Sequence, residues 1–233
     1  MRIAVLGATG VVGDSIVREA LRDRRIDGIL AIARRTLQHS HPKLDTAVHS
    51  DFTDFRQLEP ALARVDVIVC ALGISWYQAK SEAQYRKITH DYVIACARVG
   101  SVANPALHFC FVSGHGANPK GSQAWARIKA QTEHDLEAMF GSRLNVFRPG
   151  YIHPVHGREG PYWGDTIMRP LLPLRSVMSR WITDSGEVAR AVLFAATGGQ
   201  VPSPATNRDM IAAAATYAQV RSALESVRRV GQA

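Results

Sequence analysis

The feature that most constrains this chain is a run of regularly spaced glycines directly after an apolar segment near its N-terminus. Ile3–Leu6 is apolar, and Gly7-Ala8-Thr9-Gly10-Val11-Val12-Gly13 follows. A strand, a tight turn and a helix start place bare backbone N–H groups at the positive end of a helix, where a pyrophosphate can bind. Gly7 permits the turn, Gly10 lets phosphates approach and Gly13 lets the helix pack on the strand. The spacing is not G-x-G-x-x-G, and a turn that merely connects strand and helix is the alternative.

Short apolar runs alternate with longer segments of helical periodicity up to Arg148. Two of the runs are nearly continuous in apolar residues, as strands covered on both faces are. This order predicts an α/β fold, a Rossmann-type doubly wound parallel sheet. The predicted strands are Arg2–Leu6, Gly28–Ala33, Thr46–His49, Val65–Ala71, Leu107–Val112 and Leu144–Arg148, and the predicted helices between them are Val11–Asp23, Phe55–Ala63, Ser81–Val99 and Ser122–Phe140.

The pattern changes after the last of these strands. The stretch Pro149–Pro173 is rich in Gly, Pro and aromatic residues, and we predict that residues 149–185 form loops over the site. A helix begins at Ser185, which can cap it, and ends at Gly198-Gly199. A last helix is predicted over Asn207–Arg228. With no repeat and no long linker, we expect one domain over residues 1–233 with a small C-terminal lobe on the substrate side.

Two arginines, Arg34 and Arg35, follow the second predicted strand, and no carboxylate stands there. At this place an acidic side chain binds the ribose 2′-OH of NAD(H), whereas an Arg accommodates the 2′-phosphate of NADP(H). A charge-assisted hydrogen bond contributes about 1.5–3 kcal/mol, which is enough to set a preference. The cofactor predicted is therefore NADP(H) rather than NAD(H). The alternative is that both arginines are ordinary surface charges.

The composition is that of a globular protein with a basic surface. It is 46% hydrophobic and 21% charged with a net charge of +8, but the basic residues are scattered, with no basic run of five or more. We therefore predict neither a nucleic-acid nor a membrane partner. The N-terminal segment lacks the marks of a signal peptide, and no apolar stretch approaches the about 18–20 residues of a membrane span, so a cytoplasmic location is expected. Cys70, Cys96 and Cys110 form no C-x-x-C pair, which indicates buried thiols and no metal site.

The motifs occur in an order that resembles the short-chain dehydrogenase/reductase superfamily, in particular its atypical, Tat-interacting-protein-like NAD(P)H-binding group. The resemblance runs from Arg2 to about Ala196. It is carried by the glycine turn, Arg34, Asp51-Phe52, Ala71-Leu72-Gly73, Ser113, Lys129, Phe147-Arg148-Pro149-Gly150 and Asp184-Ser185-Gly186-Glu187-Val188-Ala189.

The resemblance implies where the rest of the cofactor lies. Asp51 and Phe52 match the pair that contacts adenine, although Asp51 could instead cap a helix. The segment Ala71-Leu72-Gly73 matches the stretch against the nicotinamide ribose. The segment Arg148-Pro149-Gly150-Tyr151 matches the stretch near the nicotinamide ring, with an ordinary turn after a strand as the alternative.

The resemblance also implies a catalytic Ser, Tyr and Lys. Ser113 and Lys129 occupy the expected places, but Trp125 stands where the Tyr is expected, four residues before Lys129 on the same helix face. An indole N–H cannot exchange a proton at useful pH. Candidate replacements near the site are Tyr77, Tyr85, His90 and His115. His115 titrates near neutrality, and the alternative is an ordinary exposed loop histidine. Trp76 and Tyr77 follow the Gly73 segment and could form a wall of the substrate pocket, with simple packing under a loop as the alternative.

Two functions follow from these observations. The first is an NADP(H)-dependent oxidoreductase on a small carbonyl-type substrate, favoured by Ser113 and Lys129. The second is a non-catalytic NADP(H)-binding, redox-sensing regulator, favoured by Trp125, which uses the cofactor to order Pro149–Pro173 for a protein partner. A homodimer is a further partner state that the sequence leaves open.

Overall fold

The computed structural model describes residues 1–37, 39–157, 169–175 and 177–230. Its centre is a six-stranded parallel sheet in the order β3-β2-β1-β4-β5-β6. The glycine turn follows β1, the strand at which the chain order reverses, because β1 pairs with β2 on one side and with β4 on the other. The strands are β1 (Arg2–Leu6), β2 (Gly28–Ala33), β3 (Leu44–Val48), β4 (Val67–Cys70), β5 (His108–Val112) and β6 (Leu144–Phe147).

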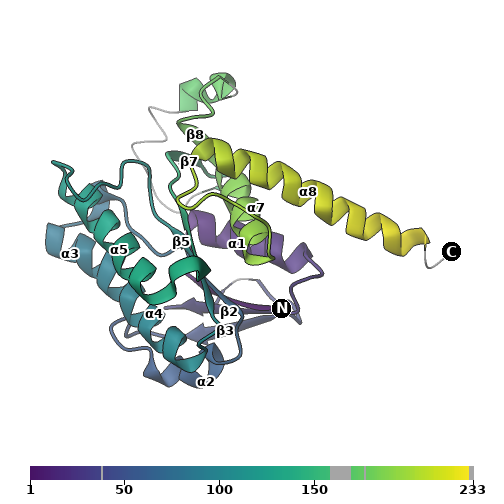
Figure 1. Ribbon diagram of the computed structural model, residues 1–233, viewed down its shortest axis with the longest axis horizontal. Coiled ribbons are helices and arrows are strands. Elements are labelled where there is room, and N and C mark those ends of the chain that lie inside the picture. The colour runs from purple at the N-terminus through teal and green to yellow at the C-terminus, as the bar shows by residue number, and fades with distance from the viewer. Residues whose placement is uncertain (38, 158–168, 176, 231–233) are drawn as a thin grey trace.

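Helices cover both faces of this sheet (Figure 1). Ile3 and Val5 of β1 belong to the core under α1, α7 and α8, whereas Ala4 and Leu6 belong to the core under α2, α4 and α5. This alternation is what a strand buried on both faces requires. The doubly wound parallel sheet is therefore confirmed. The helices are α1 (Val11–Arg22), α2 (Glu59–Leu62), α4 (Tyr92–Ala103), α5 (Ala124–Phe140), α7 (Ser185–Ala196) and α8 (Asn207–Val230).

Two predicted helices are less regular than expected. The segment predicted over Ser81–Val99 consists of α3 (Glu82–Arg86), a π-helical turn at Lys87–Asp91 and then α4. The segment predicted over Phe55–Ala63 begins as a 3₁₀ turn at Arg56–Leu58 before α2. Hydrophobic periodicity locates a helix but does not resolve one-turn changes in its winding. The remaining short helical turns are Trp76–Gln78, Gly141–Arg143 and Arg169–Leu174.

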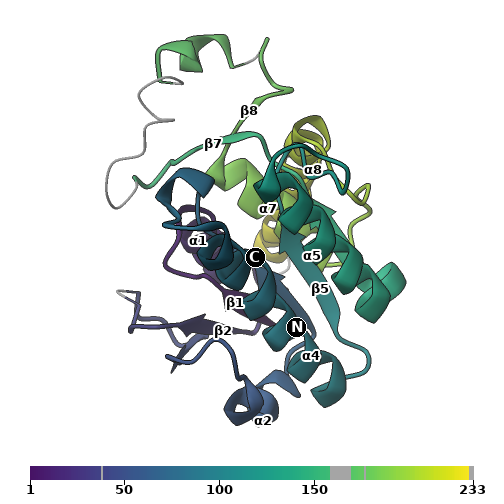
Figure 2. The ribbon, with the colours of Figure 1, turned by 90° about the vertical axis from the view of Figure 1, so that its left-hand side faces the viewer.

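The prediction that residues 149–185 are loops is wrong for the two ends of that segment. β7 (Tyr151–His153) pairs in parallel with β8 (Ile182–Asp184), and both lie beyond the main sheet in Figures 1 and 2. Strands of three residues are too short for their alternation to be read from the sequence. Residues 158–168 lie outside the described residues. None of the helices in the described ranges combines the length and the apolar composition that a membrane span requires.

The helix cap predicted at Ser185 belongs to its neighbour. Asp184 is the N-cap residue of α7 and accepts a hydrogen bond from the Glu187 amide at 2.7 Å, while the Glu187 side chain accepts one from the Asp184 amide. These reciprocal bonds form a capping box. The Ser185 hydroxyl instead hydrogen-bonds the hydroxyl of Ser15 on α1 at 2.8 Å. This buried contact ties α7 to the helix that begins at the glycine turn.

Candidate functional site

The glycine turn is sterically closed to side chains. Gly7 has a φ of 86°, and a Cβ there would lie 2.8 Å from backbone atoms of Ala71 and Leu72 on the neighbouring strand end. A Cβ at Gly13 would lie 2.0 Å from the carbonyl oxygen of Gly7. Both contacts are shorter than any side chain allows, so the turn requires glycine at these positions. Gly13 thus lets the first turn of α1 pack against the glycine turn, and Gly7 lets that turn pack against the segment that follows β4.

The N-terminus of α1 has no side chain to cap it. Gly10 is its N-cap residue, and no side-chain hydrogen bond satisfies the first amides of the helix. The α7 helix of the same chain shows a complete capping box at the equivalent place. An uncapped helix start with glycine at the cap suits an anionic group, because the free N–H groups and the helix dipole both favour negative charge.

A cleft of about 430 Å³ opens between this turn and the carboxyl ends of β4 and β5; we call it the central cleft. It brings together eleven of the residues that the sequence predicted for the site, from five separate segments of the chain. Five more lining residues, among them Ser75 and Gln78, were not predicted. The predicted residues are Thr9, Gly10, Val11, Val12, Ala71, Leu72, Gly73, Ser113, Lys129, Gly150 and Tyr151.

A network of buried and partly buried polar side chains adjoins the cleft. The Ser113 hydroxyl donates to Glu133 Oε1 at 2.5 Å, and Arg148 Nε donates to the same oxygen at 3.0 Å. Lys129 Nζ donates to the backbone carbonyl of Ser113 at 2.8 Å. Glu133 was missed by the sequence analysis, although its position four residues after Lys129 places both on one face of α5. Arg148, predicted near the cofactor, points to Glu133 and does not line the cleft.

The ammonium of Lys129 has a pKa below that of an ordinary lysine. Burial lowers its pKa, the nearby Glu133 raises it, and the balance leaves the pKa at about 8. The residue is half-buried and lines the central cleft. A lysine with a lowered pKa in a cleft is a group that can give or take a proton there.

Trp125 lies away from the cleft residues. The edge of its ring rests against the turn after β5, where a Cβ on Gly116 would lie 3.0 Å from Trp125 Cη2. Trp125 is half-buried and is not among the residues that line the central cleft. The position four residues before Lys129 therefore contributes packing of the loop after β5.

None of the four suggested replacements for the missing Tyr lines the central cleft. Tyr77 is 69% exposed, and Tyr85 is buried with its pKa raised to about 12 by that burial. His90 lies between Asp91 and Asp135, with its ring nitrogens 2.7 and 2.8 Å from their carboxylates. His115 packs edge-on against another aromatic ring, that of Trp181. The only described tyrosine that lines the cleft is one predicted near the nicotinamide ring, Tyr151.

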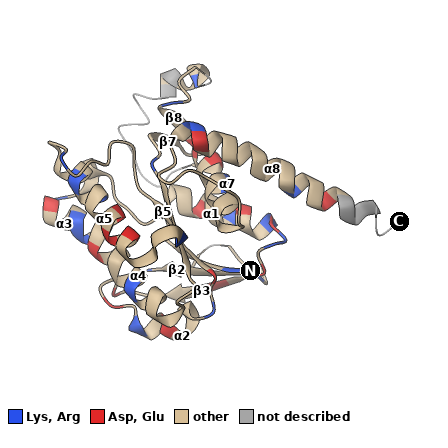
Figure 3. Cartoon of the chain, in the orientation of Figure 1, with Lys and Arg blue, Asp and Glu red and all other residues tan. Residues whose placement is uncertain are grey.

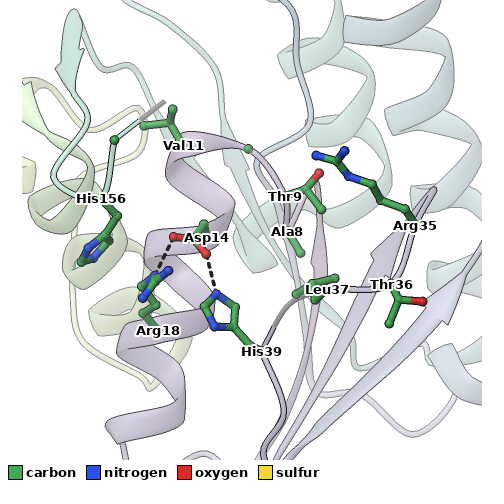
Figure 4. Close-up of a pocket in the computed structure, with 12 residues that line it drawn as sticks. Ala8, Thr9, Val11, Asp14, Arg18, Arg35, Thr36, Leu37, His39 and His156 are labelled. Carbon is green, nitrogen blue, oxygen red and sulfur yellow. Dashed lines mark hydrogen bonds and ion pairs between the residues drawn. The ribbon is translucent and has the colours of Figure 1, made fainter. Parts of the chain in front are cut away.

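A second cavity of about 490 Å³ lies on the other side of the glycine turn; we call it the outer cavity (Figure 4). Thr9, Gly10 and Val11 line both spaces, so the two meet at the turn. The side chain of Arg35, predicted to bind the cofactor, borders the outer cavity, whereas Arg34 does not. Unpredicted lining residues include Asp14, Arg18, Thr36, Leu37, His39 and His156.

Asp14 organises the positive side chains of the outer cavity. Its carboxylate accepts a hydrogen bond from Arg18 Nε at 2.6 Å and lies 2.6 Å from His39 Nε2 (Figure 4). Burial alone would raise the pKa of Asp14, but the hydrogen bonds and charges of Arg18 and His39 outweigh burial and lower it. His39 therefore connects the loop after β2 to the first turn of α1, a contact that no local sequence pattern signals.

The remaining predicted site residues border neither space. Asp51 is exposed and accepts hydrogen bonds from the amide and hydroxyl of Thr53. The Phe52 side chain is 5% exposed and packs among His49, Phe55 and Tyr92. The carbonyl of Pro149 accepts a hydrogen bond from the His115 amide at 2.7 Å. The predicted contacts of Asp51 and Phe52 with adenine stay predictions.

The three cysteines are buried, as predicted from their apolar surroundings. Burial raises the pKa of Cys70 and of Cys110 to about 12, so both thiols are neutral at physiological pH. Within the described ranges, no group of three or more His, Cys, Asp or Glu side chains is placed to hold a metal ion.

Comparison with protein families matches residues 7–148 to a family described as NAD(P)H-binding. Among individual proteins, the chain is 28% identical over 214 residues to "Protein fmp52, mitochondrial" of Aspergillus niger, covering 86% of this chain and 90% of that protein. It is 29% identical over 153 residues to "Protein HTATIP2" of Rattus norvegicus, covering 64% of this chain and 62% of that protein. The resemblance inferred from the motifs is thereby confirmed.

Solved structures share the fold. A short chain dehydrogenase from Burkholderia cenocepacia in complex with NADP aligns with a TM-score of 0.64 at 18% identity, over 97% of this chain and 95% of that one. An oxidoreductase of the short chain dehydrogenase/reductase family from Burkholderia thailandensis aligns with a TM-score of 0.60 at 22% identity, over 84% of each chain. The Rossmann architecture is therefore the one found in short-chain dehydrogenases.

Proposed function

The chain belongs to the NAD(P)H-binding family, and we propose that it is an NADP(H)-dependent oxidoreductase that acts on a small carbonyl-type substrate. The observation that carries this proposal is the pair of spaces that meet at Thr9, Gly10 and Val11. A dinucleotide is a long ligand with a pyrophosphate in its middle, and the uncapped start of α1 lies at the middle of this combined space.

The preference for NADP(H) is supported by the charges of the outer cavity. Arg35, Arg18 and His39 border it, and Asp14 is the single acidic residue among the described lining residues. A 2′-phosphate placed there would meet a guanidinium that can bind two of its oxygens at once.

The central cleft supports the chemistry. NADPH, when bound, supplies a hydride to the substrate carbon. Lys129, in the N-terminal half of α5, and Ser113, directly after β5, both line this space. Lys129 would hold the nicotinamide ribose and bring positive charge to the developing alkoxide. Ser113 would accept a hydrogen bond from a hydroxyl or an amide N–H of the bound substrate or cofactor, because its own hydrogen is donated to Glu133.

The proposal is tested in two steps. Fluorescence titration with NADPH and NADH measures binding, and NADPH oxidation is then followed against a panel of aldehydes, ketones and quinones. We expect micromolar NADPH binding and turnover of at least one carbonyl compound by the native chain. If neither the native chain nor Trp125→Tyr turns over any member of the panel while NADPH still binds, the enzyme proposal is wrong.

Trp125 favours a second candidate, a non-catalytic NADP(H)-binding regulator. Its ring packs on the Gly116 turn and offers the cleft no proton donor. Such a protein would use cofactor occupancy to control how the region 149–173 meets a protein partner. NADPH-dependent capture of a partner by a chain that turns over no substrate supports this candidate.

The remaining partner and location predictions also stand as proposals. Lys and Arg are interspersed with Asp and Glu over the helices and strand ends (Figure 3), which supports a small-molecule ligand and no nucleic acid. Affinity for DNA with a steep salt dependence would contradict this. A homodimer and a cytoplasmic location stay predictions; the relatives called Fmp52 are named mitochondrial.

A further inference from the structure

Six of the described residues that line the central cleft have polar side chains, but few of these can exchange a proton. They are Thr9, Ser75, Gln78, Ser113, Lys129 and Tyr151. Aliphatic hydroxyls and amides do not ionise in the physiological range. The hydrogen of Ser113 is moreover committed to Glu133, a carboxylate that is itself held by Arg148. Among these six side chains, Lys129 and Tyr151 are therefore the two that can ionise.

The ammonium of Lys129 has hydrogens left to donate directly to a ligand in the cleft. Its Nζ donates one hydrogen bond, to the carbonyl oxygen of Ser113, and within the described part of the chain it has no second acceptor. An ammonium carries three hydrogens, so two remain for a ligand. Gly114 leaves the space that the side chain occupies, since a Cβ there would lie 3.1 Å from Lys129 Cε. The ammonium thus lies at the end of β5, inside the cleft.

Two titratable groups, Glu133 and Cys70, lie near the ammonium. Glu133 lies one helical turn further along α5, but its oxygens are taken by Ser113 and Arg148, and no ion pair joins it to Lys129 among the described residues. Cys70, at the end of β4, is a neutral thiol, because burial raises its pKa to about 12. Burial of the ammonium outweighs the carboxylate and leaves the pKa of Lys129 at about 8. Lysines tuned to this range serve as acids and bases in enzymes.

We propose that Lys129 itself donates the proton in the carbonyl reduction, from Nζ directly to the substrate oxygen. The inference rests on the proposed function. With a reduced dinucleotide bound to supply the hydride for the new C–H bond, the C=O π bond would open and an N–H bond of Lys129 would break to form the O–H bond. The products are the alcohol, the oxidised dinucleotide and a neutral Lys129 amine, which takes its next proton from water entering the cleft. Glu133 and Arg148 are positioning residues for Ser113 in this arrangement.

The first test needs no substrate. Trace acetylation of the native chain with acetic anhydride, from about pH 6 to about pH 11, labels only neutral amines. Mass spectrometry of the digest then measures the extent of acetylation at each lysine. We expect Lys129 labelling to rise with a midpoint near pH 8 and to be suppressed by NADPH. Lys120, which is exposed, reports the reagent in the same digest. A Lys129 midpoint near the ordinary lysine value of about 10.4 overturns the proposal.

The second test compares rates of hydride transfer in a single turnover. The Lys129→Arg variant keeps the positive charge, but a guanidinium does not release a proton in this pH range. We expect a rate roughly 10²–10⁴-fold lower than native, with NADPH affinity within about threefold. The native rate should be flat below pH 8 and fall above it, because the donor must be protonated. If the native chain turns over substrate and Lys129→Arg has the same rate and pH profile, Lys129 is not the proton donor, and the proposed function still stands. If the native chain turns over no substrate, the proposed function is wrong as well.

Chemical rescue separates proton donation from charge. Lys129→Ala leaves a space in which added ethylamine can supply an ammonium, while tetramethylammonium brings the same charge without a proton. We expect ethylamine to restore hydride transfer and tetramethylammonium to leave it unchanged. Tyr151→Phe completes the comparison: if it removes the inflection in the pH profile and Lys129→Arg keeps it, Tyr151 is the donor and the proposal is wrong.

Discussion

Ser113 donates its hydroxyl hydrogen to Glu133, which lies on the helix that follows, rather than to the cleft. Glu133 is 9% exposed and is also bonded by the guanidinium of Arg148. A carboxylate in this environment can only accept hydrogen bonds, so the direction of the Ser113 hydrogen is fixed. Toward any ligand Ser113 therefore offers lone pairs, which suit a hydroxyl or an amide N–H better than a bare carbonyl oxygen.

Glu133→Ala should destabilise the folded protein by about 1–3 kcal/mol, because it leaves the Ser113 hydroxyl and the Arg148 guanidinium without their acceptor. The lower part of that range applies if water reaches Arg148, whose side chain is 32% exposed. Urea unfolding with an unchanged m-value measures the effect. Glu137→Ala, at an exposed position one turn further along α5, is the matched control and should stay within about 0.5 kcal/mol of native. Equal midpoints for the two variants would show that the network does not stabilise the fold.

Gly13→Ala should damage both folding and cofactor binding. The added Cβ would lie 2.0 Å from the Gly7 carbonyl oxygen, so the turn or α1 must move. We expect a loss of about 1–3 kcal/mol or more in unfolding free energy and at least about tenfold in NADPH affinity. Gly73→Ala is the control for stability, because nothing lies within 4 Å of a Cβ at that position. A Gly13→Ala chain as stable as Gly73→Ala would contradict the steric argument.

The sheet could be predicted because its signals are local. An apolar run that ends at a turn residue determines a strand, and β1 (Arg2–Leu6) and β2 (Gly28–Ala33) have the predicted bounds. The parallel order follows from the helical segments between strands. β7 and β8 could not be predicted, because each has three residues and pairs with a partner about thirty residues away.

The site was predicted only in part, because some of its contacts join segments that are far apart in the sequence. Residues at strand ends reach one cleft because parallel strands end together, which is why Ser113 and Gly73 were found. The contacts of Glu133 with Arg148 and of Asp14 with His39 join segments that are distant in the chain. Charged pairs of this kind are formed by tertiary packing, and neither spacing nor periodicity reveals them.

Asp14 should contribute stability that disappears in acid. Burial favours its neutral form, but the hydrogen bonds of Arg18 and His39 hold its pKa below the ordinary value. A carboxyl with a lowered pKa in the folded state binds fewer protons folded than unfolded. Its stabilisation is complete above the ordinary value of about 3.9 and is lost as the pH falls through the lowered pKa.

Asp14→Asn should therefore be less stable than native at neutral pH, and the difference should shrink as the pH falls from about 5 to about 2. Urea midpoints of both chains across this range measure it. The same comparison in an Arg18→Gln background should give a smaller difference at neutral pH, because the two residues share one interaction. A difference that is constant with pH would mean that the Asp14 carboxylate titrates alike in the folded and unfolded chain.

Arg35 and Arg34 should differ in their effect on cofactor choice, although they are neighbours in the sequence. Arg35 borders the outer cavity and Arg34 does not. If the outer cavity receives the 2′-phosphate, Arg35→Ser removes a charge-assisted contact of about 1.5–3 kcal/mol and lowers NADPH affinity by about ten- to a hundredfold. NADH carries no 2′-phosphate, so its affinity should change by less than about threefold. Fluorescence titration of both cofactors against native, Arg35→Ser and Arg34→Ser measures the preference. An equal loss of NADPH and NADH affinity in Arg35→Ser would mean that this arginine contacts a part of the dinucleotide that both cofactors have. A larger loss of NADPH affinity alone in Arg34→Ser would place the 2′-phosphate contact outside the outer cavity.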